Sequence, residues 1–351
     1  SAQQVLRQAV TGQLPDVSYQ GLNRQRVFAD RGLAVDLTPF IKAEKGWAGM
    51  GYDQALLSLG QVKGQQVGIG FALSTPVIYY NADLMRKAGV EPDRFPTTWE
   101  AIMNAAKKSK SATPGTDSLH VEWDITGNWM WQALVFSNGG TMLTADEKKV
   151  AFDGPAGKAA IQTLEQLVKQ GEMRNIAYSA AWQDFVSGKL AVLATTTARL
   201  GSITKQVGGK FEIRTARMPV AKDGRLPAGG NAAMMFSKDS AKQAAAWEYI
   251  KFATGPLGAT TMVKATGYFP ANTLPANDPK LLAPFYQANP NHLTAIAQMP
   301  VLTGPYAFPG DNGFKITDVI KDHLQTVVSQ EVQPAVALTD MSKAVQALLP
   351  R

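Results

Sequence analysis

The stretch Phe71-Ala-Leu-Ser-Thr-Pro-Val-Ile-Tyr-Tyr-Asn-Ala-Asp-Leu-Met-Arg-Lys-Ala-Gly-Val90 decides the fold class. Pro76–Tyr80 is rich in β-branched and aromatic residues, which favours an extended strand. Asn81 follows at the N-cap position of a short helix, and Gly89 is placed to end that helix. A strand that passes directly into a capped helix indicates layers of α and β structure.

The alternation of strands and helices continues on both sides of this stretch. We expect strands at Leu14–Tyr19, Gln66–Phe71, Leu190–Ala194, Phe211–Met218 and Asn231–Phe236. We expect helices at Val5–Val10, Gln25–Arg31, Pro96–Lys108, Gly127–Ser137, Gly154–Gly171, Ala180–Gly188, Ser240–Thr254 and within Ile316–Leu349, with Ser240 as an N-cap. This order predicts an α/β protein with mainly parallel sheets.

The length and composition predict two lobes and a sizeable core. A chain of 351 residues is too long for one compact core. Apolar residues make up 45% and charged residues 18%, which excludes wholesale disorder. The net charge of +7 is dispersed in short clusters such as Lys107–Lys110, without interleaved aromatic residues. We therefore interpret the basic residues as a solvated surface and rank a nucleic-acid binder last.

Several classes of site are excluded or unsupported. The chain has no Cys, and its three His residues are isolated at 120, 292 and 323, so we predict no metal and no cofactor. Neither a nucleophile elbow, nor a Walker loop, nor a dinucleotide fingerprint is present, so we predict no catalytic residues. Glu122 and Asp124 flank Trp123 on a segment that we expect to be a surface loop.

The sequence also leads to predictions about solubility and about the N-terminal part of the chain. No run of eighteen apolar residues occurs, and the first residues form a helix-like pattern without a preceding strand. We expect a soluble protein from which an N-terminal strand and helix, together with any signal peptide, are missing.

Aromatic residues mark one candidate binding region. Trp123, Trp129 and Trp131 fall within nine residues, and Trp182 lies on a later helix. A single Trp is usually a core residue. Trp129 and Trp131, however, differ by two positions and cannot share one helical face. We therefore assign one to the core and Trp131 to a cleft, where aromatic faces suit sugars or cationic groups.

Hydroxyl-bearing residues and glycines mark a second candidate binding region. Thr195-Thr-Thr-Ala-Arg199 follows a buried strand and offers hydroxyls with one guanidinium, a cradle for an anion. The alternative is a helix N-cap with a surface arginine. Gly229 and Gly230 allow close approach of backbone N–H groups to a ligand, or simply form a tight turn.

The opening stretch, followed by Glu91-Pro-Asp-Arg-Phe-Pro-Thr-Thr-Trp-Glu100, resembles the hinge strand and first helix of family 1 extracellular solute-binding proteins. These are the receptors of carbohydrate-type ABC importers. Further similar motifs follow in the family's order across essentially the whole chain: Thr11–Val17, Val150–Asp153, Phe185–Ala191, Ala228–Asn231, Trp247–Phe252 and Ala265–Pro270.

Within the family, the chain is most similar to the glycerol-3-phosphate and glycerophosphodiester-binding branch. The resemblance implies ligand contacts from Ser74, the Gly229-Gly230 backbone and Tyr268. Gln20 in Tyr19-Gln20 stands where that branch has Glu, and Pro300–Pro309 lacks the branch's Arg-rich run. The full candidate ligand-binding set is Tyr19, Gln20, Ser74, Thr75, Trp131, Trp182, Arg199, Gly229, Gly230, Asn231 and Tyr268.

The resemblance implies a class II periplasmic-binding-protein-like fold, in which two α/β lobes are joined by a multi-strand hinge beside an interlobe cleft. We place lobe one at 1–75 plus 231–295 and lobe two at 76–230 plus 296–351. The implied function is capture of a polyol phosphate by hinge closure and delivery to membrane permease subunits. We expect a monomer located in the periplasm, or tethered outside the membrane of a Gram-positive cell. The alternatives are a sugar or oligosaccharide receptor and a carbohydrate-active hydrolase or lyase.

Overall fold

The computed structural model describes residues 2–350. These residues divide into two compact units. Unit 1 contains the chain up to Thr75, Ala228–Ile296 and Thr303–Ala307. Unit 2 contains Pro76–Pro227, Ala297–Leu302 and the chain from Phe308. The units differ from the predicted lobe boundaries at 228–230, 296 and 303–307. Residues 229 and 230 fall in unit 1 because they pair with Ser74 and Leu73.

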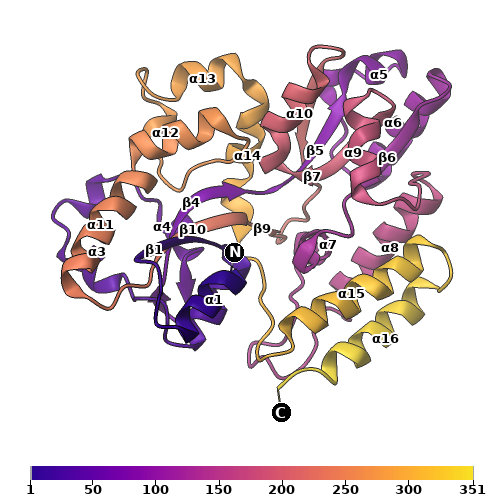
Figure 1. Cartoon of the computed structure of the whole chain (residues 1–351). Coiled ribbons are helices and arrows are strands. Elements are labelled where there is room, and N and C mark those ends of the chain that lie inside the picture. The colour runs from indigo at the N-terminus through magenta and orange to yellow at the C-terminus, as the bar shows by residue number, and fades with distance from the viewer. Residues whose placement is uncertain (1, 351) are drawn as a thin grey trace. The chain divides into compact units, whose positions relative to one another are not determined.

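Unit 1 is built on a three-stranded sheet in the order β1-β10-β4. Its strands are β1 (Val17–Gly21), β4 (Ile69–Ser74) and β10 (Gly229–Met235), with β2 (Gln61–Val62) and β3 (Gln65–Gln66) as a separate hairpin. Its helices are α1 (Ala2–Val10), α2 (Gln25–Asp30), α3 (Thr38–Ala43), α4 (Gln54–Ser58), α11 (Ser240–Thr254), α12 (Pro256–Ala265) and α13 (Ala283–Ala288), and α14 (Leu293–Gln298) runs to its boundary (Figure 1).

Alternation along β10 gives unit 1 a core on each face of its sheet. Met235 packs with Trp247 and Ile250 of α11. Met234 faces the other way and packs with Phe28 of α2. A strand whose successive side chains are both buried needs helices on both faces, and α11 and α2 supply them.

Unit 2 is built on a four-stranded sheet in the order β6-β7-β5-β8. The strands are β5 (Pro76–Asn81), β6 (Asp117–Val121), β7 (Leu190–Thr196) and β8 (Ile213–Arg217), while β9 (Leu226–Pro227) and β11 (Leu302–Thr303) form a short separate pair. The helices are α5 (Ala82–Lys87), α6 (Trp99–Ala112), α7 (Trp129–Ser137), α8 (Pro155–Lys169), α9 (Tyr178–Val186), α10 (Leu200–Val207), α15 (Gly313–Val328) and α16 (Pro334–Gln346).

The core of unit 2 lies between this sheet and its helices. Tyr79 and Leu193 of the sheet pack with Phe185 of α9 and Ile203 of α10. Figure 1 shows α15 and α16 side by side, next to α8.

The prediction of mainly parallel sheets is wrong. In the two larger sheets, β6–β7 is parallel, whereas β1–β10, β10–β4, β5–β7 and β5–β8 are antiparallel. In each of these sheets the strand that runs against the others is the one that enters from the other unit: β5 continues from β4 of unit 1, and β10 follows the unit 2 segment that ends at Pro227. A helical crossover within one sheet makes strands parallel, but β5 and β10 do not enter their sheets through such a crossover.

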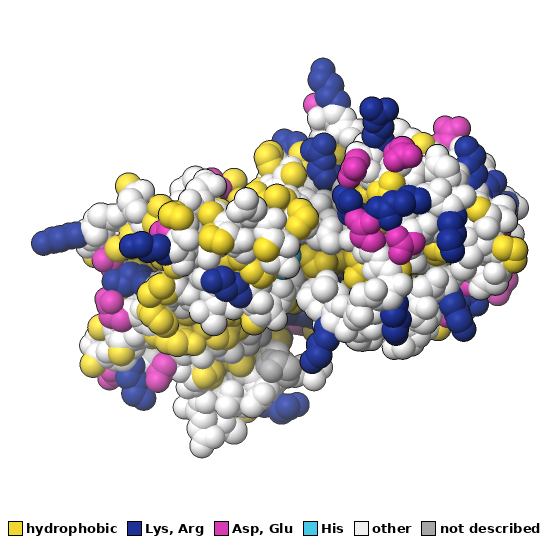
Figure 2. Space-filling model, turned by 90° about the horizontal axis from the view of Figure 1, so that it is seen from above, with side chains coloured by type: hydrophobic (Ala, Val, Ile, Leu, Met, Phe, Trp, Pro, Cys, Tyr) yellow, Lys and Arg dark blue, Asp and Glu magenta, His cyan; other side chains and the backbone are white. Residues whose placement is uncertain are grey.

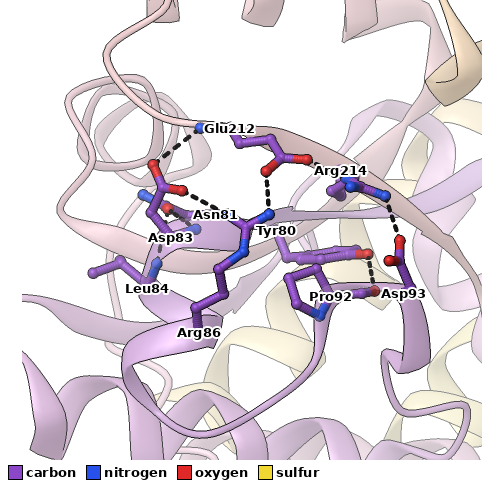
Figure 3. A network of polar contacts seen from close by, with 9 residues as sticks. All are labelled: Tyr80, Asn81, Asp83, Leu84, Arg86, Pro92, Asp93, Glu212 and Arg214. Atoms are coloured by element: carbon purple, nitrogen blue, oxygen red, sulfur yellow. Dashed lines mark hydrogen bonds and ion pairs between the residues drawn. The ribbon is translucent and has the colours of Figure 1, made fainter.

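Polar contacts fasten one end of the unit 2 sheet (Figure 3). The Asn81 carboxamide oxygen accepts the Asp83 and Leu84 N–H groups, each at 3.1 Å, as the predicted N-cap of α5. Arg86 of α5 pairs with Glu212, and Arg214 of β8 pairs with Glu212 and with Asp93. This network lies at the end of β5 opposite Pro76, so it leaves the Pro76 end of the sheet for other contacts.

No helix among residues 2–350 is long and apolar enough to cross a membrane. On the face shown in Figure 2, Lys and Arg side chains are interspersed with Asp and Glu rather than gathered by sign.

Candidate functional site

In unit 1, strand register brings most of the predicted residues together. Gly229 pairs with Ser74, Gly230 with Leu73, and Asn231 with Ala72 of β4 and Gly21 of β1. Phe269 bridges Leu73, which carries the neighbouring Tyr268 to the same strand. We call Gln20, Ser74, Gly229, Gly230, Asn231 and Tyr268 cluster 1.

The backbone of cluster 1 depends on glycine. Gly230 has a φ of +97°, which L side chains rarely adopt, and a Cβ there would lie 1.9 Å from the Ala72 carbonyl oxygen. The pairing of β10 with β4 then shifts register between Asn231 and Ala232. The positive φ and the shifted register show that the two glycines begin strand β10 next to β4 and do not form a simple tight turn.

The side chains of cluster 1 differ in what they contact. The Asn231 carboxamide oxygen is buried without a hydrogen-bond partner. The Gln20 amide donates to the Ser18 hydroxyl at 2.8 Å. Ser74 is buried, as is Thr75 beside it. Cluster 1 thus presents one unsatisfied acceptor, which a donor on a solute would satisfy.

Tyr19 lies on β1 beside cluster 1. Its ring centroid is 4.3 Å from that of Phe71, and its hydroxyl is 2.7 Å from the Tyr249 hydroxyl of α11. Burial and this hydrogen bond raise the pKa of Tyr19. Tyr19 therefore stays a neutral phenol whose hydroxyl is already hydrogen-bonded within unit 1.

In unit 2, a second polar group gathers where β6 and β7 end. We call Glu122, Asp124, Tyr178, Trp182, Thr195 and Arg199 cluster 2. The Thr195 hydroxyl donates to the Glu122 carboxylate and lies 3.4 Å from the Tyr178 hydroxyl. The Asp124 carboxylate accepts the Tyr178 N–H at 3.4 Å. Parallel strands meet here at their carboxyl ends, the usual position of ligand sites in α/β sheets.

Arg199 covers the aromatic part of cluster 2. Its guanidinium carbon lies 5.5 Å from the Trp182 ring centroid and 6.0 Å from that of Tyr178. The Trp182 indole N–H donates to Gln206 at 3.1 Å. Thr196 caps the following 3-10 helix (Thr197–Arg199) by accepting the Ala198 N–H. The alternative of a helix N-cap with a surface arginine is therefore confirmed: Arg199 is exposed, and its guanidinium stands over two aromatic rings.

The expectation that Glu122 lies on the surface is wrong. Glu122 is 4% exposed, because it follows β6 directly and is hydrogen-bonded to the buried Thr195 of β7. Burial raises its pKa to about 7, with Asp124 adding to that effect and Thr195 and Arg199 opposing it. Sequence reasoning missed Glu122 and Tyr178 as site candidates. A strand predicted at Asp117–Val121 would have indicated that Glu122 lies at a strand end. That strand was not among those expected.

Trp131 is buried in unit 2. All nine residues of α7 are buried, so placing Trp129 and Trp131 on different faces does not expose either one. Trp131 is 1% exposed, and its ring packs edge-on against Phe152 at 6.1 Å. Its role as a ligand contact stays a prediction, as does that of Trp182.

Among residues 2–350, no group of three or more acidic or His side chains could hold a metal ion.

Comparisons with known proteins show the family of the chain. The model of a family described as bacterial extracellular solute-binding protein matches residues 1–294. The sn-glycerol-3-phosphate-binding periplasmic protein UgpB of Pectobacterium atrosepticum is 26% identical over 338 residues, which cover 93% of this chain and 73% of the relative. UgpB of Escherichia coli K12 is 26% identical over 325 residues, 89% of this chain and 71% of the relative.

Solved structures give the same fold. The cyclic alpha-maltosyl-1,6-maltose binding protein of Arthrobacter globiformis aligns with a TM-score of 0.81 at 25% identity, covering 99% of this chain and 87% of that protein. UgpB of Mycobacterium tuberculosis, in complex with glycerophosphocholine, aligns with a TM-score of 0.83 at 22% identity and the same coverage. The predicted periplasmic-binding-protein-like fold class is therefore confirmed.

Proposed function

The chain belongs to the bacterial extracellular solute-binding proteins, and from this we propose that its solute is a small polyol phosphate such as glycerol-3-phosphate or a glycerophosphodiester. As a member of this family it is the solute-binding component of an ABC import system and not an enzyme. The hydrolase alternative is thereby excluded. The UgpB relatives, named for glycerol-3-phosphate, support the proposed solute class.

One observation carries the proposal. Cluster 1 joins the glycine pair, Ser74 and the unsatisfied Asn231 oxygen at the end of the unit 1 sheet from which the chain continues into unit 2 at Pro76. Strand-end residues with an unsatisfied acceptor suit a hydroxyl-bearing ligand. We further propose that solute binding shifts the population toward a closed arrangement of the predicted lobes, with the crossing segments as hinges.

The remaining predictions about context belong to the same proposal. We propose that the protein acts as a monomer outside the cytoplasmic membrane, in the periplasm or tethered to the membrane of a Gram-positive cell, and hands the solute to permease subunits. It uses no cofactor and binds no nucleic acid in this account. Periplasmic UgpB relatives support the location.

A second candidate is a sugar or oligosaccharide solute. The cyclic alpha-maltosyl-1,6-maltose binding protein, with its TM-score of 0.81, supports this alternative.

The test is a thermal-shift screen on protein unfolded and refolded to remove any carried solute. Glycerol-3-phosphate, a glycerophosphodiester and maltose are compared in wild type and in Asn231→Ala, with Asn289→Ala, an exposed asparagine of unit 1, as control. A ligand at 100 times its Kd stabilises by about 2.7 kcal/mol. Loss of one hydrogen bond to Asn231 weakens binding by about tenfold. A response to maltose alone would replace the proposed solute class with the second candidate.

A further inference from the structure

Cluster 2 carries more hydrogen-bond acceptors than cationic donors. Glu122 and Asp124 bring two carboxyl groups, and the outer oxygen of Asp124 (Oδ1) is buried without a partner. Arg199 is the one cation within the cluster as defined, and its guanidinium stands over the Trp182 and Tyr178 rings. A fully ionised phosphate group only accepts hydrogen bonds, so it cannot satisfy these oxygens. A hydroxyl group both accepts and donates, so it can.

Glu122 is buried among groups of unit 2 that act on its charge. Thr195 of β7 donates to it, and Asp124 follows it along the same segment. The charge of Glu122 raises the pKa values of Tyr178 in α9 and Tyr79 in β5. The charge of Arg199 lowers the pKa of Glu122, whereas the charge of Asp124 raises it. Burial raises the pKa of Tyr178 to about 12, so both phenols stay neutral near pH 7. Arg199 is therefore the positive group and Asp124 the negative group that act on Glu122 among these residues.

We infer that Glu122 is a specificity-determining residue: while Glu122 is ionised, cluster 2 takes only a neutral, hydroxyl-bearing group, and it takes the phosphate group of the solute only when Glu122 is protonated. This inference rests on the proposed function and deepens it. An ionised carboxylate in a buried site repels a second anion strongly, since the surrounding dielectric screens little. Protonation removes that repulsion and also turns Glu122 into a donor toward the phosphate oxygen.

The inference has a measurable consequence. The Glu122 pKa of about 7 makes the protonated fraction about 0.9 at pH 6 and about 0.1 at pH 8. If only that fraction binds the anion, the apparent Kd rises about tenfold between pH 6 and pH 8. Binding at pH 7 also takes up about half a proton per solute. A neutral sugar meets no such requirement.

The experiment is calorimetric titration with a phosphodiester, glycerophosphoglycerol, and with maltose, at pH 6, 7 and 8. A diester is chosen because a phosphate monoester titrates itself near pH 6. Two buffers of different ionisation enthalpy report the proton uptake of the wild type. The variants are Glu122→Gln, which keeps the shape and removes the charge, and Glu91→Gln, which removes the same charge at an exposed position of unit 2.

The expected result is a tenfold rise of Kd for the diester from pH 6 to pH 8 in wild type and Glu91→Gln, and a flat profile in Glu122→Gln. Diester binding that is independent of pH and takes up no proton overturns the inference and leaves the proposed function intact. An unchanged slope in Glu122→Gln overturns it too. If that variant does not fold, the wild-type proton uptake decides. Absence of binding by both solutes overturns the proposed solute class and, with it, this inference.

Discussion

His120 makes the stability of unit 2 sensitive to acid. The side chain is 1% exposed on β6, and neither ring nitrogen has a hydrogen-bond partner. Burial, helped by the charge of Arg174, lowers its pKa from 6.5 to about 4. As the pH falls below 6.5, the unfolded chain gains a proton at this residue that the folded chain does not. Stability from His120 is therefore lost between about pH 6.5 and pH 4.

The magnitude follows from the pKa gap. Each pKa unit corresponds to about 1.4 kcal/mol, so the fall from 6.5 to about 4 amounts to about 3.5 kcal/mol in full, of which about 3 kcal/mol is lost by pH 4. Glu122 acts in the opposite direction, because its pKa is raised to about 7 and the folded state binds its proton first. The two effects overlap in pH, so the wild-type profile alone does not isolate His120.

The comparison that isolates it is His120→Leu against wild type. Urea unfolding followed by tryptophan fluorescence gives the free energy of unfolding at pH 7 and at pH 4. The free energy of the variant minus that of wild type should increase by about 3 kcal/mol on going from pH 7 to pH 4. Equal differences at the two pH values would refute the reasoning, whatever the stability of the variant at pH 7.

Three further predictions concern particular contacts. Gly230→Ala should destabilise unit 1 by about 2–4 kcal/mol in urea unfolding and abolish solute binding, because of its positive φ and the Ala72 carbonyl; a neutral effect would contradict the strand register. Asn81→Ala removes the acceptor of two backbone N–H groups and should cost about 1 kcal/mol, with Asn289→Ala as control. Arg86→Ala breaks exposed ion pairs and should cost less than about 1 kcal/mol, a loss that vanishes in 1 M salt.

Local features of the fold were predictable because their causes lie within a few residues. Asn81 caps α5, and Thr98, within the predicted start of the next helix, accepts the Ala101 N–H. The helix Ser240–Thr254 was predicted to the residue, but Asp239 rather than Ser240 is its N-cap. Both residue types cap well, so composition alone does not distinguish between adjacent candidates.

Features set by distant residues were not predictable in the same way. The antiparallel pairing of Gly229 with Ser74 joins residues far apart in the chain, and strand spacing says nothing of it. Burial of Glu122 depends on Thr195 of a strand much later in the sequence. All nine residues of the α7 helix are buried, so helical periodicity does not separate the environments of Trp129 and Trp131. The resemblance to a family predicted the fold class correctly, because its motifs are spread over essentially the whole chain.

The central claim is that the refolded chain binds a small polyol phosphate reversibly. Calorimetric titration with glycerol-3-phosphate tests it most directly. We expect one solute per chain with a Kd in the micromolar range or tighter, which corresponds to a binding free energy of about −8 kcal/mol or more favourable. We expect no heat of binding in Gly230→Ala. Absence of heat with glycerol-3-phosphate and glycerophosphodiesters at millimolar concentration, from protein that unfolds cooperatively, would contradict it.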